Sequence, residues 1–357
     1  MSPSKRDFLE VPVEHLSLTT FNPVPLVESM ERMAFQARNL ARAARIYEAM
    51  LRERGCGIIL CLAGSLVSAG LKRVIAEMVE NRMVDVIVST GANMVDQDFF
   101  EGLGFRHWIG SPDADDGELR RLHIDRIYDT YIDEDELRVC DETVARIADG
   151  LEPRPYSSRE ILREMGRYLA HHGANHDSIL EACFHREVPV FCPALSDSSA
   201  GFGFVDHQWR AAREGRPAAS IDSARDFLEL TRIKLMVGET GLLMVGGGVP
   251  KNFAQDVVVA AEVLGFEVEM HRYAVQITVA DVRDGALSGS TLEEAHSWGK
   301  VDQGAEQMVF GEATVLLPLL AGHAYHRHAW EGRPEYRFSR LLDEVPVGEE
   351  AEALARA

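Results

Sequence analysis

The sequence lacks the features of several protein classes. Its longest apolar runs, such as residues 313–321, fall far short of the roughly 20 residues that cross a bilayer. Its first residues contain no apolar signal core. The five cysteines include no CxxC pair, which argues against a disulfide framework and against a structural zinc site. We therefore expect a cytoplasmic protein with reduced cysteines and no membrane partner.

Positive charge is also scarce. The chain has 37 Lys and Arg residues against 57 Asp and Glu residues, a formal net charge of −20. This balance disfavours a nucleic-acid partner and is compatible with a cationic small-molecule substrate. Internal repeats and low-complexity tracts are lacking too. With 357 residues and 46% hydrophobic composition, what is present fits a globular protein of enzyme size.

The chain divides into segments of different character. The first residues have no clear periodicity, after which residues 25–54 show apolar positions at helical spacing and end at Gly55. The last segment is charged and contains prolines, which indicates a surface location. The predicted units are an N-terminal arm with helices (1–55), a catalytic domain (56–330) with a mainly helical insertion (105–173), and a peripheral C-terminal tail (331–357).

A repeated strand, turn and helix pattern begins at Gly57. Short runs of Val, Ile and Leu separated by helical patterns predict a mostly parallel sheet with helices on both faces. The expected fold is an open, doubly wound α/β domain with an N-terminal helical extension. The predicted strands are residues 57–62, 84–88, 188–192, 241–245, 274–278 and 308–310.

Small residues follow several of these strands, where open parallel sheets bind their ligands. Gly246, Gly247 and Gly248 allow the backbone to approach a pyrophosphate or carboxylate closely at the start of a helix. A tight turn that needs positive φ angles explains the same triplet. None of these loops is a GxGxxG fingerprint, so the pattern alone leaves the ligand open. The other loops are Ala63-Gly64-Ser65, Thr90-Gly91-Ala92 and Ser196-Asp197-Ser198.

Lys300 is the candidate nucleophile, at the end of the run Ser297-Trp298-Gly299-Lys300. A lysine attacks only as the neutral amine, which requires desolvation or a neighbouring cation. The Trp298 indole can supply an apolar wall or hold an alkylammonium by cation–π attraction. An ordinary surface lysine beside a core tryptophan is the alternative, and the residues alone favour it. Acidic side chains precede the run at Asp281, Asp284, Glu293 and Glu294.

The histidines offer no convincing metal site. Two clusters have no carboxylate or cysteine at ligand spacing, so we expect exposed residues at helix ends and no bound metal. His207 follows the Asp197 turn and is a candidate for lining the crevice, although packing accounts for it equally well. The clusters are His171, His172 and His176, and His323, His326 and His328.

Four of these segments resemble the deoxyhypusine synthase family, in the family's order and over about residues 25–323. The resemblance implies a Rossmann-like NAD domain, assembled as a homotetramer whose active sites lie at dimer interfaces. The matching segments are AGSLVSAG (63–70), PALSDSS (193–199), GGGVPKN (246–252) and EEAHSWGK (293–300).

The resemblance also implies roles for individual residues. Lys300 would form a covalent imine with an aminoalkyl group, in a dry crevice beside the nicotinamide ring, while Trp298 and Glu294 would hold a polyamine substrate. Glu312 falls at an NAD contact where the family usually has aspartate. The expected NAD contacts are Gly64, Ser65, Ser68, Thr90, Gly91, Ala92, Asp197, Gly246, Gly247, Gly248 and Glu312, and Asn252, Asp284 and His207 complete the expected amine site.

Three departures from the family bear on the substrate. Asn252 stands where hypusine-forming members have a histidine, and Phe202 and Leu287 stand where they have substrate-contacting aspartates. Losing a proton acceptor and two anions changes which amine can be bound, because an unpaired buried ammonium is costly. We expect an NAD-dependent aminobutyl transferase whose acceptor is a small amine such as putrescine, giving a homospermidine-like product, or a protein lysine. The alternative is a non-catalytic NAD-binding scaffold with an eroded amine site.

Overall fold

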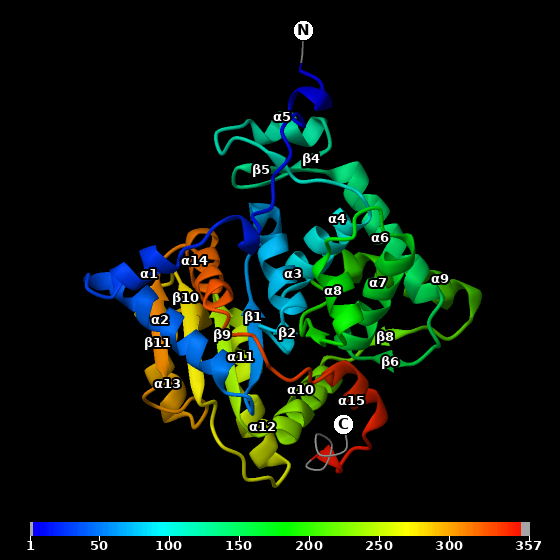
Figure 1. The fold of residues 1–357 in the computed structure, drawn as a ribbon. Coiled ribbons are helices and arrows are strands. Elements are labelled where there is room, and N and C mark those ends of the chain that lie inside the picture. Colours follow the sequence, from blue (N-terminus) through cyan, green and yellow to red (C-terminus); the bar gives the residue numbers. More distant parts are fainter. Residues whose placement is uncertain (1–2, 351–357) are drawn as a thin grey trace.

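A computed structural model describes residues 3–350 of the chain, and its centre is a six-stranded sheet (Figure 1). The strand order is β11-β10-β9-β1-β2-β7, and every neighbouring pair is parallel. From β1 the chain builds one edge through β2 and β7, then returns to the other side of β1 and builds the opposite edge. The strands are β1 (Gly57–Leu62), β2 (Val86–Val88), β7 (Val190–Phe191), β9 (Thr240–Val245), β10 (Tyr273–Thr278) and β11 (Glu306–Phe310).

These strands overlap the predicted runs, and the predicted Rossmann-like α/β class is confirmed. Every residue of β1, β9 and β10 is buried. Ile58 and Leu60 pack into the apolar layer on one face, whereas Ile59 and Cys61 pack into the layer on the other. Because both faces are covered, both sets of side chains leave water, and the strand sequence is continuously apolar.

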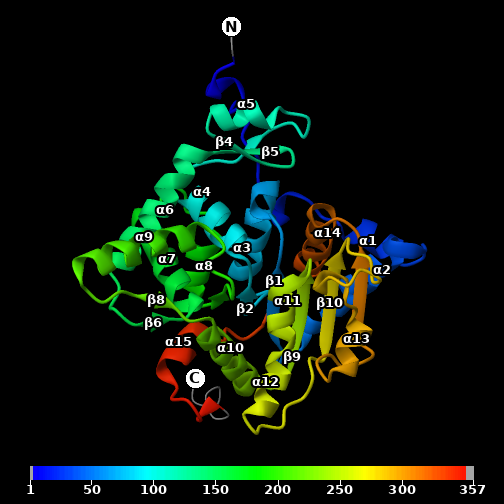
Figure 2. The same ribbon diagram turned by 180° about the vertical axis from the view of Figure 1, so that it is seen from behind.

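Helices form the two covering layers (Figures 1 and 2). The layer over Ile58 and Leu60 contains α2, α3 and α14, and the layer over Ile59 and Cys61 contains α10, α11 and α12. A further group, α6 to α9, lies on the side of the molecule away from β11. The bounds are α1 (Val24–Met30), α2 (Phe35–Arg52), α3 (Lys72–Glu80), α4 (Phe100–Gly102), α6 (Glu134–Asp149), α7 (Ser158–His172), α8 (Ile179–Arg186), α9 (Ser199–Glu214), α10 (Ser223–Val237), α11 (Gly248–Gln255), α12 (Val257–Val263), α13 (Leu292–Ser297) and α14 (Ala313–His326).

The segment 105–173 is mainly helical, as expected, and it also contains strands that the sequence did not reveal. Between the main sheet and α6 it forms a small antiparallel sheet in the order β3-β5-β4, which projects from the body of the molecule beside the N-terminal arm (Figures 1 and 2). Leu119, Ile124 and Tyr131 give this part its own apolar cluster. Its elements are β3 (Trp108–Ile109), α5 (Asp116–Arg121), β4 (Ile124–Ile127) and β5 (Thr130–Asp133).

The C-terminal segment was expected to be peripheral, and its described part is instead integral to the core. Helix α15 (Phe338–Glu344) contacts α10 and buries Phe338 and Leu342 in the same apolar layer. Arg333 is 2% exposed, pairs with Asp85 and donates to the carbonyl oxygen of Cys56 (3.3 Å). A guanidinium is tolerated there because carbonyl and carboxylate oxygens replace its water. Residues 351–357 of the predicted tail and 1–2 of the predicted arm lie outside the described residues.

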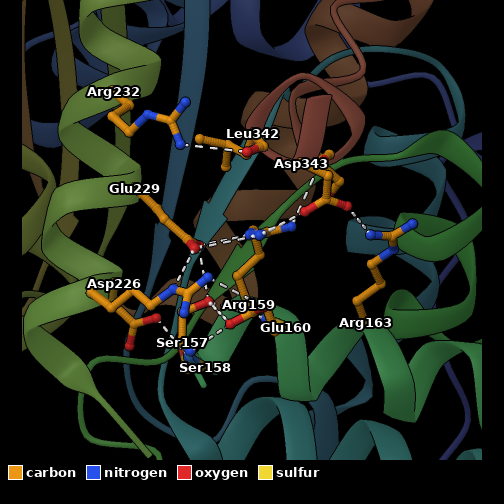
Figure 3. Close-up of polar contacts among 12 residues, drawn as sticks. Ser157, Ser158, Arg159, Glu160, Arg163, Asp226, Glu229, Arg232, Leu342 and Asp343 are labelled. Carbon is orange, nitrogen blue, oxygen red and sulfur yellow. Dashed lines mark hydrogen bonds and ion pairs between the residues drawn. The ribbon is translucent and has the colours of Figure 1, made fainter. Parts of the chain in front are cut away.

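A buried ionic cluster fixes α15 to its neighbours (Figure 3). Arg159 of α7 donates to Glu229 of α10 (2.7 Å) and to Asp343 of α15 (3.0 Å). Arg232 of α10 donates to the carbonyl oxygen of Leu342 (3.4 Å). Because the Arg159 side chain is only 2% exposed, these acceptors compensate for the loss of its hydration.

The helices of residues 3–350 include none with the length and apolar character needed to cross a bilayer.

Replacing Arg333 with leucine should leave Asp85 as a buried carboxylate without its cation. We expect the free energy of unfolding to fall by about 3–5 kcal/mol, measured by urea denaturation. Arg337→Leu is the matched control, because the Arg337 side chain is 43% exposed and pairs with Glu335 near the surface. Equal, small losses in the two variants would contradict a structural role for the buried pair.

Candidate functional site

A cleft of about 760 Å³ lies at the carboxyl ends of β1, β9, β10 and β11. The strand order reverses between β1 and β9, so the loops after these two strands diverge and leave room for a ligand. The structure brings together in this cleft six of the predicted NAD contacts, which are Gly64, Ser65, Ser68, Gly246, Gly247 and Glu312.

The glycine triplet has a structural reason at each position. Gly246 and Gly248 have φ angles of 79° and 67°, in the left-handed region that favours glycine. A Cβ on Gly247 would lie 2.5 Å from the Cα of Ser288, in the loop after β10. The triplet therefore serves a tight turn, and it also leaves a cradle free of side chains where α11 begins.

Two helix N-termini border the cleft. Helix α11 starts at Gly248 with Pro250 in its first turn, and α14 starts at Ala313. Glu312 caps α14, because one carboxylate oxygen accepts from the backbone N–H of Thr314 (2.9 Å) and of Val315 (3.2 Å). The Glu312 carboxylate already occupies the start of α14, whereas α11 has no side-chain cap, so the partial positive charge at the start of α11 makes this edge suitable for an anionic ligand.

Two buried amides, which the sequence reasoning missed, hold the loop after β1. Asn93 accepts from the backbone N–H of Leu66 (2.9 Å), and Gln97 accepts from that of Ser68 (2.8 Å). Both lie in the π-helical segment η4 (Ala92–Phe99) and are at most 1% exposed. Their separation of four residues is the only sequence signal that could have identified them.

The loops after β2 and β7 lie outside this cleft. Thr90 accepts from the side-chain amide of Asn93 (3.2 Å), and Gly91 packs against Ser198. Asp96 accepts from the backbone N–H of Ser199 (2.7 Å), and burial raises the pKa of Asp96 to about 6. Of the predicted contacts, Thr90, Gly91, Ala92, Asp197 and Gly248 do not line the cleft.

Lys300 is not placed in the cleft of its own chain. Val301 forms a bridge with His271, and these residues precede β11 and β10, so Lys300 lies at the amino ends of the strands. The glycine loop lies at the start of α11, and Lys300 lies near the end of the same helix. This helix has eight residues, which span about 12 Å, and Asp256 directly after it contacts Lys300.

Asp256, a residue the sequence reasoning did not single out, joins two predicted site residues. One of its oxygens lies 2.5 Å from Nζ of Lys300, and the other accepts from the Asn252 amide (2.8 Å). The Trp298 ring centroid is 5.2 Å from Nζ of Lys300. The only hint of Asp256 in the sequence is its position four residues after Asn252, which places both on one face of α11.

The surroundings of Lys300 contradict the alternative of a surface lysine beside a core tryptophan. Its side chain is 13% exposed, whereas Trp298 is 70% exposed and is not a core tryptophan. Both border an apolar groove of about 530 Å³ between α10 and α12, which includes Leu228 and Val263. Lys300 is thus a sheltered lysine at the rim of an exposed apolar surface.

The remaining predicted amine-site residues are dispersed. Glu294 is exposed and caps α13 together with Thr291, and Asp284 is exposed in the loop after β10. His207 is a correction, because it is 2% exposed and both ring nitrogens are occupied by Asp149 (2.7 Å) and the backbone N–H of Ala219 (3.1 Å). It packs α9 against α6 rather than lining the crevice.

Two of the predicted exposed histidines are exceptions. His326 is half-buried, and its Nε2 lies 2.9 Å from the carbonyl oxygen of Leu18. His323 is 3% exposed within α14, because α14 is apolar on nearly all sides and is covered by the N-terminal segment. Within residues 3–350, no three His, Cys, Asp or Glu side chains converge in a way that could hold a metal ion.

Lys251 is a further missed residue, buried beneath the glycine loop. It is 1% exposed, and its ammonium donates to Oγ of Ser290 (2.8 Å) and to the carbonyl oxygen of the same residue. These bonds tie α11 to the loop that carries Ser288. Burial lowers the pKa of Lys251 to about 8 from its ordinary 10.5.

The pKa of Lys251 predicts a pH dependence. Between about pH 8 and pH 10.5 the unfolded chain binds a proton that the folded chain does not, so this residue makes stability rise with pH. Lys251→Met should reduce that rise, measured as the free energy of unfolding across this window. Arg121→Met is the control, since it removes a cation whose side chain is 72% exposed. An unchanged pH profile in Lys251→Met would contradict the lowered pKa.

Comparison with known proteins agrees with this fold and these motifs. The chain is 62% identical to the deoxyhypusine synthase-like protein of Chlorobaculum parvum, over 97% of this chain and 98% of the relative. It is 55% identical to the protein of that name from Coxiella burnetii, over 95% and 96%. It is 42% identical to "Probable deoxyhypusine synthase 2" of Methanosarcina mazei, over 84% and 86%.

A solved structure of a candidate deoxyhypusine synthase from Entamoeba histolytica has the same fold, with a TM-score of 0.57 and 19% identity over 88% of this chain and 97% of that one. The sequence model of the deoxyhypusine synthase family matches residues 25–324. The chain therefore belongs to the deoxyhypusine synthase family.

Proposed function

We propose that the protein is an NAD-dependent aminoalkyl transferase that carries an aminobutyl-type group from a polyamine on Lys300. The observation that carries this proposal is the placement of Lys300, sheltered between Asp256 and the Trp298 ring within an intact family motif. Family membership supports aminobutyl-type transfer, and the finer choices of cofactor, donor and acceptor are our inference.

The cleft is suited to a dinucleotide. Gly247 lines the cleft without a side chain, and helix α11 starts at its edge, which suits the pyrophosphate of NAD. Ser65 and Ser68 would donate to phosphate oxygens, and the Glu312 carboxylate would accept from a ribose hydroxyl. NAD would supply the removal and return of a hydride, so that the transfer has no net redox change.

One face of α11 connects this cleft with Lys300. Gly248, Asn252 and Asp256 follow each other at four-residue spacing and therefore lie along the same side of the helix. We infer that the nicotinamide end extends over this face towards Lys300. The glycine loop and the end of α11 beside Lys300 are about 12 Å apart along the helix. A dinucleotide is longer than a mononucleotide and is therefore better suited to span this separation.

A second copy of the chain would close the site. Around Lys300, three large apolar side chains are exposed, Trp298 by 70%, Val263 by 82% and Leu264 by 50%. Such a patch is typical of a surface covered by a partner. Covering it would exclude water from Lys300, which matters because water hydrolyses an imine. The homotetramer implied by the family resemblance provides such a cover.

The residues around Lys300 are adequate for covalent transfer. The amine has to leave its contact with Asp256 and lose a proton before its lone pair can attack a substrate imine carbon. Its nitrogen then forms the new bond while the other amine fragment departs, which leaves the carried group on Lys300 as an imine. An acceptor amine releases Lys300 by the same exchange in reverse. Asp256 is placed to hold Lys300 between these steps.

The acceptor is proposed to be a small amine such as putrescine. Asn252 uses its amide to donate to Asp256, so it supplies no proton acceptor of the imidazole kind. Leu287 and Phe202 are 42% and 67% exposed and present no charge. An amine site with fewer carboxylates can neutralise fewer ammonium groups of the bound substrate. This favours a diamine over a longer polyamine as the acceptor.

Chemical trapping tests the proposal directly. The protein is incubated with NAD and, separately, spermidine, putrescine or agmatine, reduced with borohydride and digested for peptide mass analysis. We expect an added mass on Lys300 with at least one amine and only when NAD is present. NAD binding without an adduct from any amine would support the non-catalytic scaffold instead.

Lys300→Arg should reduce transfer to background while leaving the unfolding midpoint close to that of the parent protein. Arginine keeps the positive charge and is effectively never neutral, so it cannot attack a carbon. Transfer is measured as labelled product from a labelled amine donor. The control is Lys5→Arg, since Lys5 pairs with Asp135 at the start of α6 and lines neither the cleft nor the groove beside Lys300. Substantial activity in Lys300→Arg would contradict the covalent mechanism.

A further inference from the structure

The turn between β4 and β5 carries an unusual residue. Ile127 pairs with Thr130, so the turn has two central residues, Tyr128 and Asp129. Tyr128 has a φ of 51°, in the left-handed region where such turns favour glycine, asparagine or aspartate. A bulky side chain in this conformation is strained, and strain of this kind concentrates at functional positions.

Packing does not account for Tyr128. Its side chain is 71% exposed, and the apolar cluster of the small sheet is formed by other residues, Leu119, Ile124 and Tyr131. The backbone carbonyl oxygen of Tyr128 accepts from the Arg126 guanidinium (2.9 Å), and this contact would be available to any residue at the turn, so it does not explain the aromatic side chain.

Tyr128 does line the cleft described above. With Val13, Ile109 and Ile127 it forms an apolar part of the cleft on the side of the hairpin, while Ser65 and Gly247 lie on the side of the main sheet. The hairpin lies in the projecting part of the molecule, next to the N-terminal arm (Figures 1 and 2). A cleft of this composition suits a ligand with both a charged backbone and a flat apolar ring.

We propose that Tyr128 stacks on the adenine ring of the nucleotide in this cleft. The inference rests on the proposed function, because the nicotinamide end is directed along α11 towards Lys300 and the opposite end of the dinucleotide remains near the hairpin. An exposed aromatic ring held on a rigid two-residue turn offers a preformed stacking surface. The β4–β5 hairpin would thus select a purine base, while the glycine loops select the pyrophosphate.

Tyr128→Gly is the sharpest variant, because glycine relieves the positive φ while removing the ring. Calorimetric titration with NAD, AMP and nicotinamide mononucleotide measures the effect. We expect the affinities for NAD and AMP to fall about tenfold or more, as for the loss of one base–aromatic stack, and that for nicotinamide mononucleotide to be unchanged. The unfolding midpoint should be equal to or higher than that of the parent.

Two further variants complete the test. Tyr128→Phe should keep the affinities for NAD and AMP, because it keeps the ring. Trp209→Ala removes another aromatic side chain, 65% exposed on α9 and outside the cleft, and should change no affinity. An unchanged AMP affinity in Tyr128→Gly, or a Phe variant as weak as the Gly variant, would overturn stacking.

The outcomes separate this inference from the proposed function. If the parent protein binds NAD and AMP but forms no adduct on Lys300, the transferase proposal fails while the stacking test still gives its answer. If the parent binds neither NAD nor AMP, the nucleotide site itself is overturned, and stacking with it.

Discussion

The parallel pairing of β1 with β9 is the constraint on which the rest of the structure depends. Six residues of each strand pair in register, from Gly57 opposite Thr240 to Leu62 opposite Val245, and all twelve are buried. Because the chain leaves β1 in one direction and returns on its other side, the loops after these strands are neighbours. This reversal creates the cleft and brings the glycine triplet next to the loop containing Ser65 and Ser68.

Helix α11 connects the cleft at the carboxyl ends of the strands with Lys300 at their amino ends. It begins at the glycine cradle and ends at Asp256, which contacts Lys300. Lys251, buried on the same helix, fixes the loop that approaches the cradle. The cleft and the lysine are thus separate sites within one chain, related by one helix face. The surface beside Lys300 is apolar and exposed.

Two parts of the chain outside the main sheet, the small antiparallel sheet and the C-terminal helix, contribute to the cleft and to the stability of the fold. The small β3-β5-β4 sheet adds Ile109, Ile127 and Tyr128 to the lining of the cleft. The C-terminal helix and Arg333 secure the opposite side, with carboxylates and carbonyl oxygens satisfying each buried guanidinium. Polar groups in the interior therefore stabilise the fold only as complete networks, and the loss of one partner is costly.

The sequence by itself determined the strands, the α/β class and the glycine loops. These features follow from local rules, since strands buried on both faces are continuously apolar and left-handed turns favour glycine. It did not reveal the β4–β5 hairpin, whose strands are short and end at a turn without glycine. Only the tertiary structure decided that Arg333 pairs with Asp85, that His207 is occupied by Asp149, and that Asp256 contacts Lys300. Those contacts join residues far apart in the chain, and neither periodicity nor composition records which distant side chains the fold will bring together.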